Sequence, residues 1–138
     1  MSLTMTTEEQ VMFFDTDIGG VVHNIAYLRM IETCRTHLAA EVGFDLQQMA
    51  ETQIFPVVAR TEIDYRKSAT LGNNLVITGC ITEHTRTSFW CEFEVRNKEN
   101  PDLLYITCRQ KLAVVQMPAG RPIRIPAEAL AQMQADQD

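Results

Sequence analysis

Residues 13–28 read FFDTDIGGVVHNIAYL, and this stretch decides how the chain folds. Two carboxylates, Asp15 and Asp17, stand two residues apart at the end of an apolar run. A glycine pair then interrupts the extended pattern, because glycine favours tight bends over continued strand. The stretch therefore predicts a strand over residues 8–15 that ends in two acids and a sharp turn.

A long helix is predicted after the glycine pair. Asn24 is expected to cap its start, because an Asn side chain can accept a free N–H of the first turn. Gly43 is expected to end it after about 18 residues. Between them, apolar residues recur at helical spacing, at Tyr27, Ile31, Cys34, Leu38 and Val42. A helix of this length is long for so short a chain, so we expect it to cross the whole core.

The second half of the chain has the alternation of an antiparallel sheet. Apolar and polar residues alternate over four stretches, 57–66, 75–83, 89–96 and 103–116. The break at 84–87 has the length of a hairpin. One long helix with a sheet of this kind is an α+β architecture, in which the first strand joins strands formed later and leaves the helix wrapped by the sheet.

Short elements are expected at both ends of this sheet. Residues 46–51 fit one short turn of helix after the long one. The tail at 120–126 contains two prolines and is predicted not to pair regularly. Pro126 is suited to open a weak closing helix over 127–135.

The bulk composition limits the class of protein. The chain has 138 residues, which predicts a single domain over 1–138 with its core at 8–126 and a short C-terminal tail. A net charge of −6 argues against broad binding to nucleic acid or to an anionic membrane surface. No membrane span or secretory signal is found. The four cysteines form no C-x-x-C pair, which disfavours zinc and favours free thiols in the cytoplasm.

This order of elements, with D-T-D-x-G-G-V-V-H-N-x-x-Y-L at the turn into the helix, resembles the hotdog fold. More closely, it resembles the 4-hydroxybenzoyl-CoA thioesterase-like family of acyl-CoA thioesterases. The resemblance implies one long central helix wrapped by a curved antiparallel sheet. Further matches to the family pattern are Glu32, Arg35, Ile63-Asp64-Tyr65, Leu71-Gly72, Gly120-Arg121-Pro122 and Ile125-Pro126. Ser68-Ala69 and Gly72-Asn73 depart from it near the mouth of the family's cleft, which bears on substrate preference.

The resemblance implies hydrolysis of an acyl-CoA to a free carboxylic acid and CoA. Asp17 is then the catalytic carboxylate, either as nucleophile on the thioester carbonyl or as general base toward water. Unpaired backbone N–H groups at the helix start, around residues 23–25, are suited to hold the oxyanion. His23 and Asn24 are candidate catalytic residues beside them.

The same residues also have structural interpretations. Asp17 is a residue type that caps turns, and Asp15 is expected to be structural because its side chain points away from Asp17 in a continuing strand. His23 is equally a local hydrogen-bonding group, and Asn24 is a helix cap first. Glu32 is the alternative acid–base residue, since some hotdog thioesterases use a carboxylate on the helix, although an exposed or interface charge is favoured.

The predicted substrate-binding residues are Gly20, Tyr27, Arg66, Lys67 and Arg86. The three cations stand at predicted strand ends, where they can pair with the phosphates of CoA. Tyr27 lies on the apolar stripe of the helix, so packing is its favoured role. No cofactor is expected, because CoA belongs to the substrate, and no metal is expected, because a carboxylate and helix N–H groups are sufficient for the reaction. The family's pantetheine slot lies between subunits, and a single sheet leaves an open edge, so we expect a homodimer that assembles into a homotetramer.

Two other functions are compatible with parts of the sequence. An apolar strand ending in Asp-x-Asp-x-Gly also opens the Mg²⁺-dependent phosphatases of the haloacid dehalogenase type, but these need alternating βα units that the later sequence lacks. A hotdog module that binds acyl-CoA without hydrolysing it is the second alternative. The residues leave open whether the acyl group is aromatic or aliphatic, and whether its carrier is CoA or acyl carrier protein.

Overall fold

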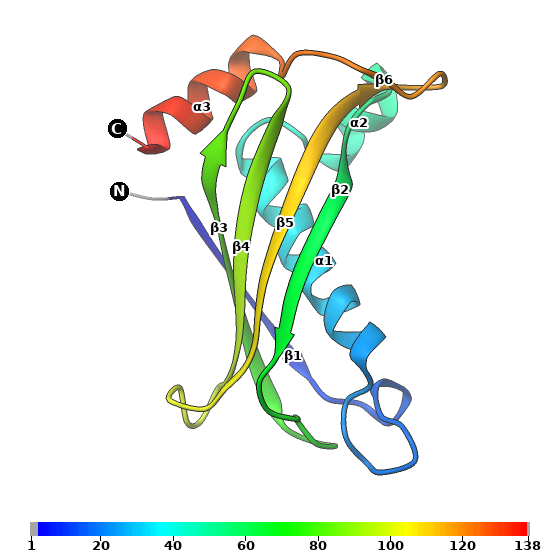
Figure 1. The fold of residues 1–138 in the computed structure, drawn as a ribbon, viewed down its shortest axis with the longest axis vertical. Coiled ribbons are helices and arrows are strands. Elements are labelled where there is room, and N and C mark those ends of the chain that lie inside the picture. The colour runs from blue at the N-terminus through cyan, green and yellow to red at the C-terminus, as the bar shows by residue number, and fades with distance from the viewer. Residues whose placement is uncertain (1–2, 138) are drawn as a thin grey trace.

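A single curved sheet wraps around one long helix, α1 (Asn24–Glu41), in the computed structural model, which describes residues 3–137 (Figure 1). The main strands are β1 (Thr4–Gln10), β2 (Ile54–Tyr65), β3 (Asn74–His84), β4 (Ser88–Asn97) and β5 (Leu104–Gln116). They lie in the order β1-β3-β4-β5-β2, and every neighbouring pair is antiparallel. This is the α+β arrangement that the sequence predicts, with the first strand joined to a strand formed much later.

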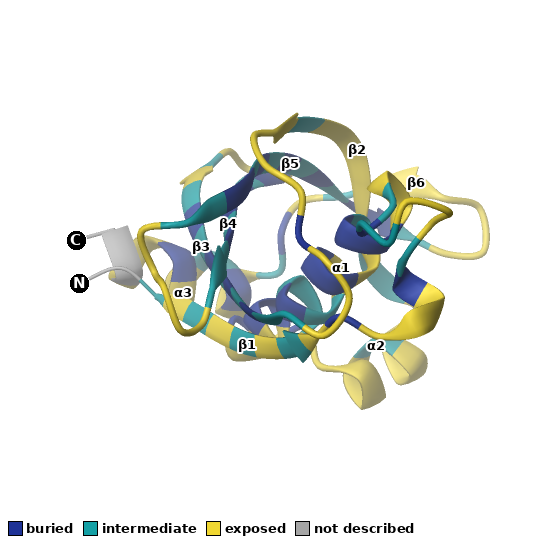
Figure 2. Ribbon diagram, turned by 90° about the horizontal axis from the view of Figure 1, so that it is seen from below, coloured by how far each residue is buried: buried dark blue, intermediate teal, exposed yellow. Residues whose placement is uncertain are grey.

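The central strands form where apolar and polar side chains alternate. Buried residues recur at every second position of β3, at Leu75, Ile77, Gly79 and Ile81, and β4 repeats the pattern. One face of the sheet is therefore apolar, as in an antiparallel sheet with one wet face. Figure 2 shows buried segments in α1 and in β3, β4 and β5, the elements that contribute most of the core.

The start of α1 differs by one residue from the prediction. His23 rather than Asn24 is the N-cap, and its ring Nδ1 accepts the N–H of Ala26 at 3.2 Å. Asn24 is the first helical residue and is exposed. The prediction was wrong because an imidazole nitrogen can receive the same first-turn N–H that an Asn oxygen usually receives. The helix has the predicted 18 residues, and Gly43 follows its end with a φ of +100°.

The apolar run before the glycines is not a strand, so the prediction of a strand over 8–15 is wrong beyond Gln10. Phe13–Asp15 form one turn of 3₁₀ helix, η1. Its cause is local, because the Asp15 carboxylate accepts the N–H of Met12 at 2.9 Å in place of strand pairing. Phe13 and Phe14 are 83% and 75% exposed, so the run does not belong to the core.

The short elements agree with the sequence except in the tail. The helices α2 (Leu46–Thr52) and α3 (Ala127–Gln137) occupy the expected segments. The tail at 120–126 does pair, through the two-residue strand β6 (Arg121–Pro122) on β5. A proline is tolerated in so short a pairing, where Ile123 next to it donates its N–H to the Val114 carbonyl at 2.9 Å. Within residues 3–137 no helix combines the length and apolar character needed to cross a membrane.

β2 lies at one end of the sheet, and no other strand of the described chain pairs with its outer edge. Val57 and Val58 on this strand are 39% and 42% exposed. Figure 2 shows β2 exposed along much of its length, in contrast to the buried parts of β5 beside it. An open edge with apolar side chains is the kind of surface that a further strand covers.

Candidate active site

A short, closed loop carries Asp17 from η1 to the start of α1. Asp17 donates its backbone N–H to the Val21 carbonyl at 3.0 Å, and its own carbonyl accepts the N–H of Gly20 at 3.0 Å. Gly20 has a φ of +73°, a conformation that glycine adopts without strain. The glycine pair therefore does what the sequence predicts and bends the chain back within a few residues.

The side chain of Asp17 is exposed on this loop. Its Oδ1 accepts the N–H of Gly19 at 3.0 Å, so the carboxylate also caps the turn. The structural and chemical interpretations of Asp17 are thus compatible. An exposed carboxylate that is held by a neighbouring N–H has a defined position and remains accessible to a substrate.

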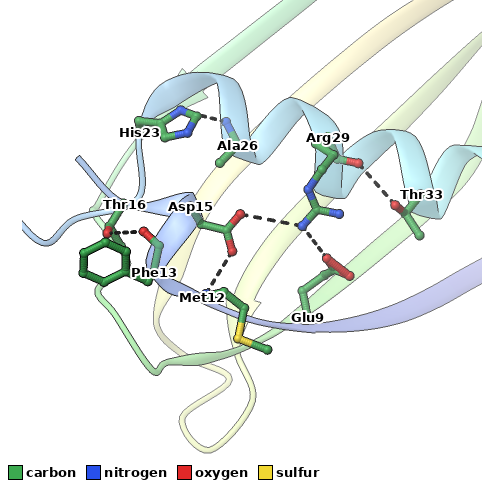
Figure 3. Close-up of polar contacts among 9 residues, drawn as sticks. All are labelled: Glu9, Met12, Phe13, Asp15, Thr16, His23, Ala26, Arg29 and Thr33. Atoms are coloured by element: carbon green, nitrogen blue, oxygen red, sulfur yellow. Dashed lines mark hydrogen bonds and ion pairs between the residues drawn. The ribbon is translucent and has the colours of Figure 1, made fainter.

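Asp15 has the opposite character, as the sequence predicts. It is 2% exposed, and its Oδ2 accepts the N–H of Met12 while its Oδ1 lies 3.8 Å from the Arg29 guanidinium (Figure 3). Arg29 is held in turn by Glu9 of β1 at 2.6 Å. The backbone carbonyl of Asp15 accepts the N–H of His23 at 3.0 Å. Asp15 therefore ties η1, β1 and the beginning of α1 together.

The helix start offers hydrogen-bond donors beside the loop. The N–H of His23 is used by Asp15, which removes it from the predicted oxyanion donors. The next N–H groups, of Asn24 and Ile25, stand in the first turn, where no intrahelical acceptor precedes them. Because Nδ1 of His23 accepts the N–H of Ala26, a neutral ring carries its proton on Nε2. His23 can thus both cap the helix and donate from its other nitrogen.

The segment that follows β2 forms the other side of this region. Val22 donates its N–H to the Ala69 carbonyl at 2.9 Å, and Leu71 donates to the Gly20 carbonyl at 3.2 Å. The hydroxyl of Tyr65, at the end of β2, donates to the carbonyl oxygen of Asn24 at 3.4 Å. The C-terminal end of β2 and the loop of Asp17 are therefore neighbours.

Tyr27 is a packing residue and is not accessible to a substrate in this structure. It is 2% exposed, and its hydroxyl accepts the N–H of Ala69 at 2.9 Å. Burial raises the pKa of this phenol, so it stays protonated at neutral pH. The residue acts on the candidate site only by fixing the segment around Ala69.

The three predicted cations are not all brought together. Arg66 and Lys67 are exposed directly after β2, at the end of the sheet where α1 begins, and Arg66 donates through Nε to the Thr107 hydroxyl at 3.2 Å. Arg86 lies on the hairpin between β3 and β4, at the opposite end of the sheet in Figure 1. Within the chain, Arg86 is therefore remote from Asp17.

A second cluster of polar side chains lies farther along α1, around Arg35. Its guanidinium donates to Oε1 of Gln110 at 2.6 Å and to Oε1 of Glu32 at 3.3 Å. Gln110 is 3% exposed on β5 and was not singled out from the sequence. The signal for it was its position in the buried phase of the strand, between Cys108 and Leu112. The side chain of Glu32 is 63% exposed. It is therefore an exposed charge, which is the role that the sequence favours for it.

No metal site is found among the described residues, since no group of three or more His, Cys, Asp or Glu side chains converges within residues 3–137. The four cysteines form no disulfide, and Cys34, Cys91 and Cys108 are buried. Burial raises the pKa of the Cys91 thiol to about 12 and that of Cys108 to about 11. These thiols are therefore poor metal ligands and poor nucleophiles at neutral pH.

Comparisons with known proteins give the family. A family model described as the Thioesterase-like superfamily matches residues 11–133. The Haemophilus influenzae protein named acyl-CoA thioesterase YbgC is 31% identical over 123 residues, which cover 88% of each chain. The fold and these likenesses are those of hotdog thioesterases. The chain belongs to the Thioesterase-like superfamily, and the family predicted from the sequence is confirmed.

Solved structures confirm the predicted fold. Slr0204, described as a 1,4-dihydroxy-2-naphthoyl-CoA thioesterase from Synechocystis, matches with a TM-score of 0.85 at 21% identity and covers 99% of both chains. SAV2348 from Staphylococcus aureus, solved in complex with CoA, matches with a TM-score of 0.89 at 12% identity and covers 99% of this chain and 85% of its own. At these identities the likenesses show the hotdog fold of this chain.

Proposed function

We propose that this chain is an acyl-CoA thioesterase, which hydrolyses an acyl-CoA with water to a free carboxylic acid and CoA. Membership in the Thioesterase-like superfamily supports thioester hydrolysis, and so does the similarity to an acyl-CoA thioesterase over most of the chain. The observation that carries the proposal is the exposed carboxylate of Asp17, on a loop that hydrogen bonds anchor next to the first turn of α1.

In the proposed reaction, the thioester carbonyl lies between Asp17 and the N–H groups of Asn24 and Ile25. As a nucleophile, Asp17 bonds to the carbonyl carbon, the C–S bond breaks, and CoA leaves as a thiolate that takes a proton from water. Water then hydrolyses the resulting anhydride to the acid and restores Asp17. As a general base, Asp17 takes a proton from water while the water oxygen attacks, and the departing thiolate receives that proton.

His23 and Asn24 are proposed to assist from the same turn. The Nε2–H of a neutral His23 ring is a donor for the substrate carbonyl or for Asp17. Asn24 is exposed at the first helical position, so its amide is accessible for a substrate contact. The positive end of the helix dipole favours the negative charge that develops on the carbonyl oxygen.

We assign the CoA phosphates to Arg66 and Lys67, which are exposed cations at the end of β2 near the Asp17 loop. Gly20 allows close approach because its Cα carries no side chain, and nothing lies within 4 Å of where a Cβ would stand. Tyr27 supports this region from inside through Ala69. Arg86, at the other end of the sheet, contributes only if a second subunit brings it to the substrate.

We further propose a homodimer that assembles into a homotetramer in the cytoplasm, and a reaction that needs no cofactor. The open edge of β2, with Val57 and Val58 exposed, supports pairing with a second copy. Exposed Phe13 and Phe14 beside the Asp17 loop are further apolar surface for such an interface. Cysteines without disulfide bonds are the state that a reducing compartment maintains.

The alternatives receive no support from the described residues. An Asp-x-Asp phosphatase needs a parallel sheet built from alternating βα units, whereas every strand pair here is antiparallel. A module that only binds acyl-CoA has no need of an exposed carboxylate beside free helix N–H groups.

The test compares wild type with Asp17→Asn on a panel of acyl-CoA thioesters. Loss of a catalytic carboxylate should lower kcat by at least ~100-fold, about 2.7 kcal/mol of barrier. Asp102→Asn removes an equally exposed charge from the turn between β4 and β5 and serves as the control. An unchanged kcat in Asp17→Asn would refute the role of Asp17, and a wild type inactive on every ester would favour the binding module.

A further inference from the structure

A cavity of about 280 Å³ lies between the second half of α1, α2, the start of β2 and the inner face of β4 and β5. Its walls are mainly apolar and include Leu38, Leu46, Met49, Phe55, Phe89 and Leu112. Phe89 is buried and stacks on Phe44 with ring centroids 6.3 Å apart, so this wall is fixed by packing. One water molecule needs about 10–15 Å³ of such space, so the cavity has room for a chain of several non-hydrogen atoms.

The charged side chains at this cavity are Glu32 and Arg35, both from α1. The Arg35 side chain is 16% exposed and donates to Gln110 and to Glu32. Gln110 holds its carbonyl oxygen toward Arg35, because its amide nitrogen donates to the Thr61 hydroxyl at 3.2 Å. A guanidinium has five N–H donors. Two contacts therefore leave Arg35 able to bind a further oxygen at the cavity.

Glu32 is a weak counter-ion for this cation. Its side chain is 63% exposed and makes one contact of 3.3 Å with Arg35. Such a pair is screened by water and has little net stability. The positive charge of Arg35 also reaches the floor of the cavity, where it opposes the rise that burial causes in the pKa of Cys91. An anion inside the cavity would thus meet a cation that is only partly neutralised.

Within one copy of the chain, the cavity lies farther along α1 than the loop that carries Asp17. It begins at Glu32, eight residues into α1, which is about 12 Å from the start of the helix. Two copies that pair antiparallel along their β2 edges, across a two-fold axis, exchange the ends of that strand. The Phe55 end of one β2 then lies toward the Tyr65 end of the other. Because Tyr65 neighbours the start of α1, this pairing brings the cavity end of one copy toward the Asp17 loop of its partner.

We propose that this cavity receives the acyl group and that Arg35 selects acyl groups ending in a carboxylate, that is, CoA monothioesters of dicarboxylic acids. The proposal rests on the proposed thioesterase function and on its dimer. A carboxylate matches the fork of a guanidinium through two parallel hydrogen bonds. The methylene chain between carboxylate and thioester fits the apolar walls, and an adipyl group provides such a chain.

Glu32 competes with such a substrate for Arg35. The substrate carboxylate must displace it or share the guanidinium with it, and the two carboxylates repel each other. Removing the charge of Glu32 should therefore strengthen binding of a carboxyacyl group, whereas removing the charge of Arg35 should weaken it. This opposite pair of effects is not expected if the two residues only hold α1 to the sheet.

The experiment measures kcat and KM for adipyl-CoA and hexanoyl-CoA, which share chain length and differ by the terminal carboxylate. Wild type should prefer adipyl-CoA. Arg35→Met should lower kcat/KM for adipyl-CoA by about 10- to 100-fold, the range for loss of a hydrogen bond to a charged group, with hexanoyl-CoA little changed. Glu32→Gln should lower KM for adipyl-CoA. Arg96→Met, which removes a cation paired with Glu94 on β4, should leave the preference as in wild type.

Equal kcat/KM values for the two esters in wild type would overturn the inference, and so would a parallel loss for both in Arg35→Met. A preference for 4-hydroxybenzoyl-CoA over adipyl-CoA that survives Arg35→Met would also overturn it. If Arg35→Met does not fold, the change of KM in Glu32→Gln decides. A wild type inactive on every acyl-CoA would refute the proposed function itself, an outcome distinct from hydrolysis without carboxylate preference.

Discussion

Asp15 and Asp17 should respond in opposite ways to substitution by alanine. Asp15→Ala should destabilise the fold, because it leaves the Met12 N–H without its partner and removes a contact of Arg29. Asp17→Ala should abolish activity and leave stability nearly unchanged, because its carboxylate is exposed and water can replace it at the Gly19 N–H.

The expected loss in Asp15→Ala follows from these contacts. A buried or partly buried donor left unpaired costs about 1–3 kcal/mol. The Arg29 contact adds less than ~1 kcal/mol, because it is 3.8 Å long, the Arg29 side chain is 48% exposed and Glu9 also pairs with it. The free energy of unfolding should therefore fall by about 1–4 kcal/mol. Asp17→Ala should remain within about 0.5 kcal/mol of wild type, as is usual for exposed positions.

Urea unfolding at fixed protein concentration measures the stabilities, and kcat on one good acyl-CoA substrate measures the chemistry. Fixed concentration matters because a dimer adds a concentration-dependent contribution. The reasoning would be refuted if Asp15→Ala were as stable as wild type. It would be reversed if Asp15→Ala lost its kcat at unchanged stability while Asp17→Ala kept activity, since Asp15 would then be the reacting carboxylate.

Two further predictions concern the core. Gly79→Ala should lower the free energy of unfolding by about 1–3 kcal/mol, because a Cβ there would lie 2.6 Å from the Phe93 ring and 3.2 Å from Cys34 Sγ. Thermal melting checks this, with Thr78→Ala on the outer face as control, and an unchanged melting temperature would contradict the packing described. The second concerns the buried thiols, whose ordinary pKa of 9.0 rises to about 12 for Cys91 and about 11 for Cys108 through burial. Since the unfolded chain releases these protons first, stability should be complete below pH 9 and fall by about 1.4 kcal/mol per pH unit and thiol up to the folded pKa values. Urea unfolding from pH 8 to 10.5 should show a shallower decline for Cys91→Ala than for wild type, and identical slopes would count against the burial of this thiol.

The sheet and α1 were predictable because their periodicity comes from burial on one face. The stretch 89–96 alternates between inward and outward residues, and the structure has β4 at Ser88–Asn97. A strand or helix whose one face is covered by the core must carry this pattern in its sequence. The fold class therefore follows from the spacing of apolar and polar residues along the chain, without knowledge of any tertiary contact.

The apolar run at Phe13–Phe14 could not be interpreted in the same way. Apolar side chains are needed both in a core and at an interface, and the sequence does not distinguish the two. The local hydrogen bond from Met12 to the Asp15 carboxylate decided in favour of a 3₁₀ turn. Burial of Tyr27 against Ala69 joins residues 42 positions apart, which a local pattern does not reveal.

Gln110 marks the limit of sequence reasoning about the site. Gln110 stands at a position of β5 where the alternation predicts burial, and this alone would have identified it as a polar side chain in the core. Such a side chain needs a hydrogen-bond partner. Its partner Arg35 is 75 positions away and belongs to a helix that the sequence could not orient against β5. The pattern alone identifies a buried polar residue that needs a partner, whereas only the fold identifies the partner and shows that Arg35 borders a cavity.

The spacing of the two acids explains how one motif can carry both structure and chemistry. The loop between them and α1 is closed at both ends, by Asp15 receiving the N–H of His23 and by Gly20 receiving the N–H of Leu71. The position of Asp17 relative to the first turn of α1 is therefore fixed largely by backbone bonds, which do not involve the Asp17 side chain. A reacting group held in this way needs little reorganisation when the substrate arrives, which lowers the barrier to reaction. It also means that the Asp17 side chain can be replaced without loss of the fold, so the division of roles between the two carboxylates can be measured separately.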